Sequence, residues 1–387
     1  MPAFTETALP MKRKANNMEI PENNGAPIGA NENESGKDKK KKRRAPVLLI
    51  ILAVLLALIL GVVLFFYIKL NGMSRGKVGT VPMPSNLPSV TAEPPELIDI
   101  DDPDKLDLTE DYDPDLDDFE FGFDSIFQRD AIDKNVINIL LLGIDKQEQY
   151  DHGRSDSTMI LSFNKTTREI KLISILRDTW IYIPGRDKWN RINAAYQYGG
   201  PGLTINTINQ NFDMDIQYYL RVDFDNLKEI VDKLGGIDIE LTEREIDYIN
   251  KGTGSNIPSV AGWHHLNGAQ TLRHARNRKI GNVDWSRTER QRKVMYALYN
   301  QAMKIRNIST LISTIYSLMD NVDTNLSPSQ IISLGLDVVL GERVELANRA
   351  MPFEGTWRYA WEGRMAVIHI DIPANRDKLH EYIYGTR

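Results

Sequence analysis

Residues 136–178 read VINILLLGIDKQEQYDHGRSDSTMILSFNKTTREIKLISILRD, and they contain three apolar runs separated by polar segments. The first run, Val136–Leu142, predicts a short buried strand. Met159–Phe163 and Ile170–Leu176 are the other two runs, and the polar segment Asn164–Arg168 lies between them. Two apolar runs joined by a short polar turn indicate a β-hairpin. This part of the chain therefore predicts a sheet that contains an antiparallel pair.

Helices and strands are also predicted after residue 178, and they follow one another along the chain. Strands mixed with helices around one core indicate an α/β or α+β sandwich. Residues 135–387 are enough for one large domain. The predicted helices cover residues 204–212, 224–234 and 376–384, and the predicted strands cover residues 237–241 and 367–372.

A further helix is predicted over residues 287–306. Ser286, with Glu289 three residues later, has the pattern of a capping box and predicts where this helix begins. The first turns of the helix carry polar side chains spaced i, i+3 and i+4, which places them on one face. These side chains are Arg287, Arg290 and Gln291.

Composition excludes several kinds of site. The chain has 387 residues, of which 47 are basic and 53 acidic, and it has no cysteine. A disulfide scaffold, a cysteine-ligated zinc or iron–sulfur site and a thiol nucleophile are therefore ruled out. The charge is segregated, with 5 basic and 17 acidic residues in 70–134 and a nearly neutral part from residue 135 onward.

Residues 45–68 form a run of 24 residues without a charged side chain. A membrane-spanning helix needs about 20 apolar residues, whereas a cleaved signal peptide has a run of about 7–15, so we expect an uncleaved signal anchor. Basic residues directly precede the run, which places a disordered leader over 1–44 in the cytoplasm. The domain over 135–387 is then extracytoplasmic, behind a Pro-rich and acidic linker over 69–134.

The predicted strands bring charged residues to one end of the sheet. Asp145 follows the first strand, where ligands of α/β sheets usually bind. Arg154 and Asp156 precede the second strand, and Arg177 follows the third. If the hairpin turns near Thr166, position 156 faces about position 177, so that Asp156 and Arg177 lie together.

A fourth cluster, residues 273–293, has eight basic and two acidic side chains. A guanidinium group binds two phosphate oxygens at once and stays charged. Carboxylates beside such a cluster suit a divalent cation that bridges carboxylate and phosphate. Together these groups predict a polyanionic substrate, a diphosphate, with Mg²⁺. Nucleic acid is disfavoured, because the domain faces outward and has no overall basic charge.

Several stretches, in order over about 155 residues, resemble the LytR-CpsA-Psr family of cell-wall proteins. The resemblance implies an α-β-α sandwich with a central mixed sheet and a long tunnel for a polyprenyl tail. It also implies an enzyme that transfers a glycopolymer, such as a teichoic acid or capsule, from an undecaprenyl-diphosphate carrier to the 6-hydroxyl of N-acetylmuramic acid in peptidoglycan. The stretches are NILLLGID (138–145), GRSDSTMIL (153–161), ISILRDTWIYIPG (173–185), RINAAYQYGG (191–200), VDFDNLKEIVDKLGGIDI (222–239) and LNGAQTLRHARNRKIGNVDWSRTERQRKV (266–294).

The resemblance also implies roles for individual residues. Asp145 and Asp156 correspond to the Mg²⁺ partners, and either is a candidate for the general base. Gln291 corresponds to a head-group contact. Arg191 stands where the family often has lysine and keeps the positive charge in a different geometry, and Arg191 and Arg287 are expected to bind substrate. The residues that correspond to diphosphate ligands are Arg154, Arg177, Arg276, Arg278 and Arg290.

Two other functions remain open from the sequence. A non-catalytic protein that binds or regulates a wall polymer would share the arginines but would gain little from Asp145 and Asp156. A membrane-tethered pyrophosphatase would use water as the acceptor in place of a sugar hydroxyl. Product analysis with and without a glycan acceptor separates these alternatives from transfer.

Overall fold

The computed structural model describes residues 78–83, 98–99, 125–145, 153–184, 186, 188–339, 346–363 and 365–385. The predicted leader over 1–44, the predicted anchor over 45–68 and most of the predicted linker lie outside these residues. Within the described ranges, no helix combines the length and the apolar character that crossing a membrane requires.

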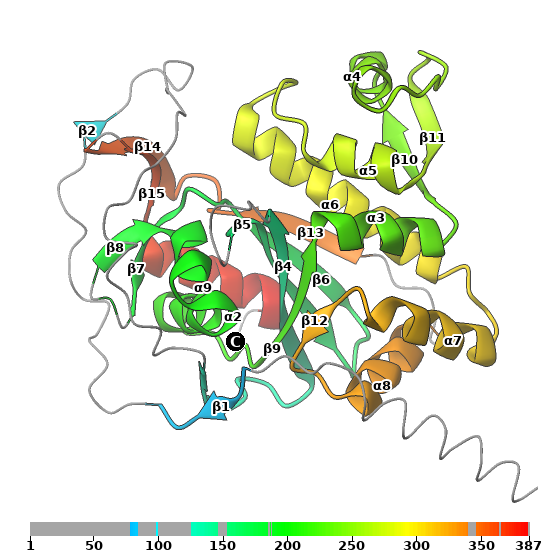
Figure 1. The fold of residues 1–387 in the computed structure, drawn as a ribbon. Coiled ribbons are helices and arrows are strands. Elements are labelled where there is room, and N and C mark those ends of the chain that lie inside the picture. Colours follow the sequence, from blue (N-terminus) through cyan, green and yellow to red (C-terminus); the bar gives the residue numbers. More distant parts are fainter. Residues whose placement is uncertain are drawn as a thin grey trace, which may run out of the picture. The chain divides into compact units, whose positions relative to one another are not determined.

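A six-stranded mixed sheet lies at the centre of the fold (Figure 1). Its strand order is β12-β9-β4-β5-β6-β13, and β4 pairs antiparallel with β5 and parallel with β9. The predicted hairpin is confirmed, because β5 and β6 pair antiparallel with Thr158 opposite Ile175. The strands are β4 (Val136–Asp145), β5 (Arg154–Asn164), β6 (Ile170–Ile175), β9 (Tyr218–Asp223), β12 (Asp323–Thr324) and β13 (Leu346–Met351).

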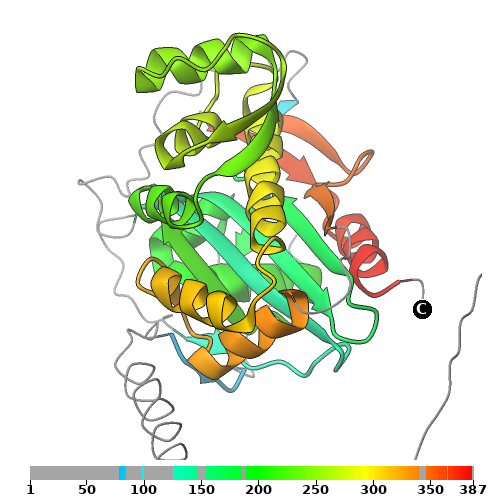
Figure 2. The same cartoon turned by 90° about the vertical axis from the view of Figure 1, so that its right-hand side faces the viewer.

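Helices pack on both faces of this sheet, as the two views show (Figures 1 and 2). Successive side chains of a strand point to opposite faces. Leu140 and Ile160 therefore share one face, where they pack with α2 (Ile192–Phe212) and α9 (Ile372–Tyr384). Met159 and Phe163 point to the other face, toward α6 (Val283–Ala302) and α8 (Pro328–Val339). The predicted mixed α/β class with a central mixed sheet is confirmed.

A second, smaller core lies beside the sheet. It buries apolar side chains such as Val231, Ile239 and Ile246 between short helices, α6 and an antiparallel strand pair. Thr242 and Glu245 form a capping box that fixes the start of α4. The elements of this part are α3 (Phe224–Lys233), β10 (Ile237–Leu241), α4 (Glu243–Thr253), β11 (Gly262–Leu266) and α5 (Gly268–Ala275).

The remaining elements complete the two faces and the edges. β7 and β8 form an antiparallel pair, and β14 pairs with both β15 and β2. The predicted late strand is therefore present but two residues earlier than expected. The bounds are β1 (Thr80–Val81), β2 (Ile98–Asp99), β3 (Ile126–Phe127), β7 (Trp180–Ile183), β8 (Lys188–Arg191), α7 (Ile308–Met319), β14 (Trp357–Glu362) and β15 (Met365–Ile370).

Three helix starts differ from the sequence prediction, and one of them is α9, which begins at Ile372 rather than at residue 376. α2 begins at Ile192 and contains a kink at Gly199 and Gly200, where only a loop before residue 204 was expected. α6 begins at Val283, so Ser286 lies inside the helix and the predicted capping box is wrong. The backbone N–H of Ser286 donates to the carbonyl of Asn282 at 2.8 Å. An acidic side chain in the first turn, Asp284, favours this earlier start through the helix dipole.

The folded domain also begins earlier than the predicted boundary at residue 135. Ile126 is fully buried and packs into the main core. The backbone N–H of Phe127 donates to the side chain of Asn206 in α2 at 2.8 Å. An apolar pair directly after the acidic stretch therefore belongs to the domain, although its surrounding charge resembles the linker.

Candidate active site

The ends of β4 and β5 deliver the two predicted carboxylates to the same edge of the sheet. Asp145 is the last residue of β4 and lies opposite Arg154, the first residue of β5. The pairing shifts register between Gly143 and Ile144. β4 thus extends to Asp145 and β5 begins at Arg154, although both residues were expected to lie outside the strands. Asp156 follows in β5, and position 156 faces position 177 when the β5–β6 register is continued.

Gly153 makes the close approach at this edge possible. Its φ of +63° lies in the left-handed region, and a Cβ atom on it would lie 2.5 Å from the carbonyl oxygen of Asp145.

We expect Gly153→Ala to lower the free energy of unfolding by at least about 1 kcal/mol, and to displace Asp145. Chemical denaturation and turnover measurements check this. Gly200→Ala, also at positive φ but with open space around its Cβ, is the control, and equal turnover in both variants would contradict the prediction.

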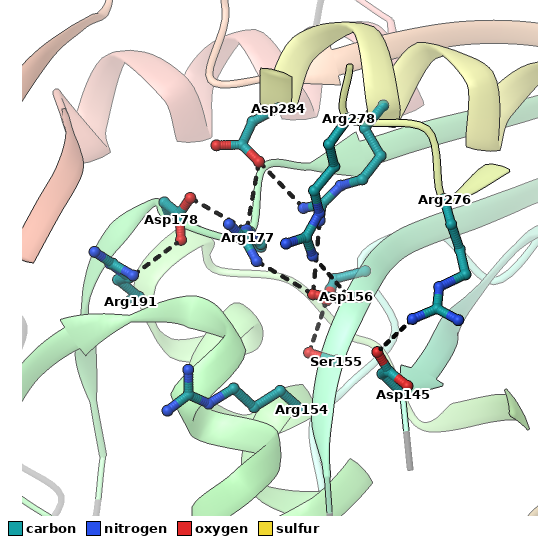
Figure 3. Close-up of polar contacts among 12 residues, drawn as sticks. Asp145, Arg154, Ser155, Asp156, Arg177, Asp178, Arg191, Arg276, Arg278 and Asp284 are labelled. Carbon is teal, nitrogen blue, oxygen red and sulfur yellow. Dashed lines mark hydrogen bonds and ion pairs between the residues drawn. The ribbon is translucent and has the colours of Figure 1, made fainter. Parts of the chain in front are cut away.

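Asp156 is the centre of an ion-pair network (Figure 3). One of its oxygens lies 3.4 Å from Nη1 of Arg177 and 3.8 Å from Nη1 of Arg287. The other lies 3.0 Å from Nη2 of Arg278. Burial alone would raise the pKa of Asp156, but these guanidinium groups outweigh burial and hold that pKa below its ordinary value. Asp156 is therefore ionised at neutral pH.

Two further carboxylates stand behind the network. Asp178 lies 3.2 Å from Nε of Arg177 and 3.5 Å from Nη1 of Arg191. Asp284 lies 3.4 Å from Nε of Arg177 and 3.2 Å from Nη2 of Arg287. Burial and the neighbouring Asp178 raise the pKa of Asp284. Burial and the neighbouring Arg177 lower the pKa of Arg287 to about 10, so it remains protonated at neutral pH.

Asp145 has fewer positive neighbours than Asp156. Its carboxylate lies 3.2 Å from Nη2 of Arg276, whose side chain is half exposed and stacks over the ring of Phe224 at 4.5 Å. Burial and the charge of Asp156 raise the pKa of Asp145, although Arg276 opposes them. The two carboxylates thus repel each other, and a cation near both would relieve that repulsion.

These side chains line one cavity of about 770 Å³. Arg154 donates to the side chain of Gln197 at 3.2 Å, and the amide of Gln291 donates to the carbonyl of Asp156 at 3.4 Å. The structure brings together nine of the ten predicted site residues. They are Asp145, Arg154, Asp156, Arg177, Arg191, Arg276, Arg278, Arg287 and Gln291.

Arg290 is the exception. It was predicted to be a diphosphate ligand, and the structure corrects this prediction. Arg290 does not line the cavity. Its Nε donates to Glu245 at 2.8 Å, and its two terminal nitrogens donate to the carbonyls of Asn277 and Ile280 at 3.0 and 2.6 Å. Arg290 therefore holds the loop that carries Arg278 in place from behind.

Some residues of the site were not predicted. Asp284, which pairs with Arg177 and Arg287, was counted only as a charge opposing the basic cluster. Arg273 was counted in the basic cluster over residues 273–293, whereas Phe224, Lys228 and Tyr248 were not singled out. Arg273 stacks over the ring of Tyr248 at 3.9 Å, and Phe224 and Lys228 line the same end of the cavity. Their position depends on how the small core packs, which single-helix patterns do not reveal.

The donor set fits a hard cation and phosphate oxygens. Carboxylate oxygens are the ligands that Mg²⁺ prefers, and it usually retains water and substrate phosphates as its other ligands. No group of three acidic or histidine side chains in the described part of the chain is arranged to hold a metal ion. A cation at Asp145 and Asp156 would therefore need oxygens of the substrate.

Comparisons with known proteins agree with this geometry. The LytR_cpsA_psr family model matches residues 118–369. The polyisoprenyl-teichoic acid–peptidoglycan teichoic acid transferase TagU of Enterococcus faecalis is 30% identical over 207 residues, which are 53% of this chain and 66% of that protein, less than two thirds.

Two solved structures have the same fold. B. subtilis TagV gives a TM-score of 0.54 at 25% identity, covering 66% of this chain and 100% of that one. The family protein YwtF (TagT), solved with bound octaprenyl pyrophosphate lipid, gives 0.51 at 22% identity and covers 65% of this chain and 91% of that one.

Proposed function

This chain belongs to the LytR-CpsA-Psr family, and on that premise we propose that it transfers a glycopolymer from a polyprenyl-diphosphate carrier to a hydroxyl of peptidoglycan. One observation carries the proposal: several guanidinium groups and two carboxylates line a single cavity. The name of the TagU relative and the lipid bound to YwtF support the same substrate class. The long tunnel for the lipid tail and the identity of the polymer remain predictions.

The reaction that fits this cavity is a phosphoryl transfer. The acceptor oxygen would bond to the phosphorus that carries the glycan, and the bond from that phosphorus to the bridging diphosphate oxygen would break. The products are a phosphodiester and a polyprenyl monophosphate. Negative charge develops on phosphate oxygens, and Arg177, Arg278 and Arg287 are held in place to stabilise it.

The proton of the acceptor hydroxyl needs a base. Asp145 suits this task better than Asp156, because its pKa is raised and it has fewer positive partners. Asp156 is held ionised by three guanidinium groups and suits a positioning role. We therefore assign Asp156 as the residue that aligns the arginines, and Asp145 as the candidate base through the carboxylate oxygen that the cation proposed below would leave free.

We further propose that Asp145 and Asp156 hold Mg²⁺, which would neutralise charge on the phosphate oxygens. Chelation with EDTA should then abolish turnover, and Mg²⁺ should restore it. Asp145→Asn should weaken the binding of Mg²⁺ to the chain with a polyprenyl diphosphate, measured by calorimetry, by at least about tenfold, which corresponds to about 1.4 kcal/mol. Asp213→Asn, at a largely exposed carboxylate outside the cavity, is the control. Full activity in EDTA would reject the metal.

Reconstitution of the full chain tests the function directly. The chain is mixed with a polyprenyl-diphosphate-linked glycan and a peptidoglycan glycan fragment, and the products are identified by mass spectrometry. Transfer predicts polyprenyl monophosphate together with a phosphodiester-linked product over many turnovers. Equal release without the acceptor would instead indicate a pyrophosphatase, and binding without turnover would indicate a regulatory protein.

We also propose that residues 45–68 anchor the protein in the cell membrane, with the N-terminus cytoplasmic and the catalytic domain outside. The proposal rests on the uncharged run and the basic residues before it. An anchor would keep the cavity close to a lipid-linked donor. A C-terminal reporter that is active only in the cytoplasm should stay inactive, and activity would overturn this topology.

A further inference from the structure

A second cavity, of about 330 Å³, lies on the opposite side of α6 from the first one. Successive residues of a helix are about 100° apart around its axis. Arg287 and Gln291 face the first cavity, whereas Arg292 and Tyr296 are turned by about 100° to 180° from them around the helix axis and line the second. The other walls come from β10, β11 and the edge strand β13. The two cavities are therefore separate sites that share one helix.

An exposed aromatic side chain stands at this cavity. Trp263 in β11 is 66% exposed, the largest exposure among the large apolar side chains of the described residues that stand out to solvent. Its cross-strand neighbour in β10 is Glu240, and Tyr296 of α6 lines the same cavity. The face of an aromatic ring is electron-rich, so it attracts the weakly positive C–H bonds on the face of a sugar ring. The surrounding polar side chains would then meet the hydroxyl groups.

Arg292 adds a donor without an acceptor. Its Nε donates to the side chain of Asn348 at 3.2 Å. Its Nη1 is buried, and no residue in the described ranges accepts a hydrogen bond from it. Burial also lowers the pKa of this side chain from its ordinary value. A buried donor without a partner is costly, and a hydroxyl or amide oxygen of a ligand would satisfy it.

The charges of the lining argue against a polyanion. Two basic side chains, Arg292 and Lys293, stand against three carboxylates, Asp238, Glu240 and Glu289. In the first cavity, by contrast, basic side chains outnumber acidic ones. A ligand with many negative charges would be repelled from the second cavity and attracted to the first.

We propose that the second cavity binds an uncharged glycan segment, with a sugar ring against Trp263 and an oxygen of the glycan accepting from Arg292. The proposal does not depend on the transfer reaction. Only the identity of the natural glycan, which would be the peptidoglycan strand around the acceptor sugar, rests on the proposed function.

The test uses the full chain and a hexamer of β-1,4-linked N-acetylglucosamine, an uncharged glycan, titrated by calorimetry. We expect saturable binding that Trp263→Ala weakens by at least about tenfold. Arg292→Gln should also weaken it. Val260→Ser is the matched control, because Val260 is 65% exposed but does not line the cavity, and it should bind as the wild type does. Circular dichroism checks that each variant is folded.

The second control separates the two cavities. Asp156→Asn lies in the first cavity and should leave glycan binding unchanged even if it stops transfer. Loss of binding in Asp156→Asn but not in Trp263→Ala would place the glycan in the first cavity and overturn the proposal. So would the absence of saturable binding at millimolar glycan, or tighter binding of a sulfated glycan that depends on Trp263.

Discussion

Asp156→Asn is expected to lower the rate of glycopolymer transfer by about 10³-fold. The carboxylate of Asp156 accepts from Arg177 and Arg278 and lies within 3.8 Å of Arg287, and its charge holds all three guanidinium groups toward the cavity. The amide of asparagine has no charge and only one oxygen, so the arginines would repel one another and move apart. The measurement is multiple-turnover release of polyprenyl monophosphate by the full chain.

The controls for this variant address folding and charge. Asp213→Asn removes a carboxylate that is 74% exposed and pairs with Arg129, outside the cavity, and its turnover should stay within about twofold of the wild type. Asp156→Asn should remain folded by circular dichroism, because asparagine keeps an oxygen for one arginine. A folded Asp156→Asn chain with turnover within tenfold of the wild type would show that Asp156 is not required for the transfer reaction.

Much of this site was accessible from the sequence because a hairpin has a simple register. Residue positions that sum to a constant face one another across an antiparallel pair. The turn near Thr166 therefore placed Asp156 opposite Arg177, and the structure has Thr158 opposite Ile175, in the same register. The apolar run of β4 also predicted a buried strand, which the cores on the two faces of the sheet confirm.

The orientation of α6 was less accessible. The sequence pattern places Arg287 and Arg290 on one face of the helix. Their spacing of three residues nevertheless puts them about 60° apart around the helix axis. That angle turns Arg287 toward Asp156 and Arg290 toward Glu245, which comes from α4 and lies 45 positions earlier in the chain. Which acid meets which arginine depends on the packing of the small core. Spacing along one helix does not contain this information.

The position of Arg290 leads to the other large effect that we expect. Arg290→Leu should lower the free energy of unfolding by about 3–5 kcal/mol, because it leaves the buried carboxylate of Glu245 without its ion-pair partner. Glu245 and Arg290 are both almost fully buried. The carbonyls of Asn277 and Ile280 would also lose their donors. Denaturant titration measures the loss. Arg273→Leu, at a partly exposed arginine that stacks on Tyr248, is the matched control and should cost less.

The double variant Arg290→Leu with Glu245→Gln separates the ion pair from the loop contacts, because glutamine removes the charge and keeps an oxygen that accepts from Thr242 in the capping box. Removing both charges should recover part of the lost stability, because no buried charge then remains unpaired. Turnover should stay low, since the carbonyls of the loop next to Arg278 still lack donors. If instead Arg290→Leu kept its stability and lost only affinity for the lipid diphosphate, Arg290 would be a ligand after all.

The stability difference between Arg290→Leu and the wild type should also depend on pH. Burial alone would raise the pKa of Glu245, but hydrogen bonds from Arg290 and Thr242 outweigh it and place the pKa below its ordinary value of 4.5. In the wild type the pair therefore stabilises the fold above pH 4.5, and this contribution is lost as the pH falls through the lower folded-state pKa. Without Arg290, burial makes Glu245 easier to protonate, which removes its unpaired charge. The difference should thus be largest near neutral pH and shrink in acid, and a pH-independent difference would mean that packing rather than the ion pair carries the effect.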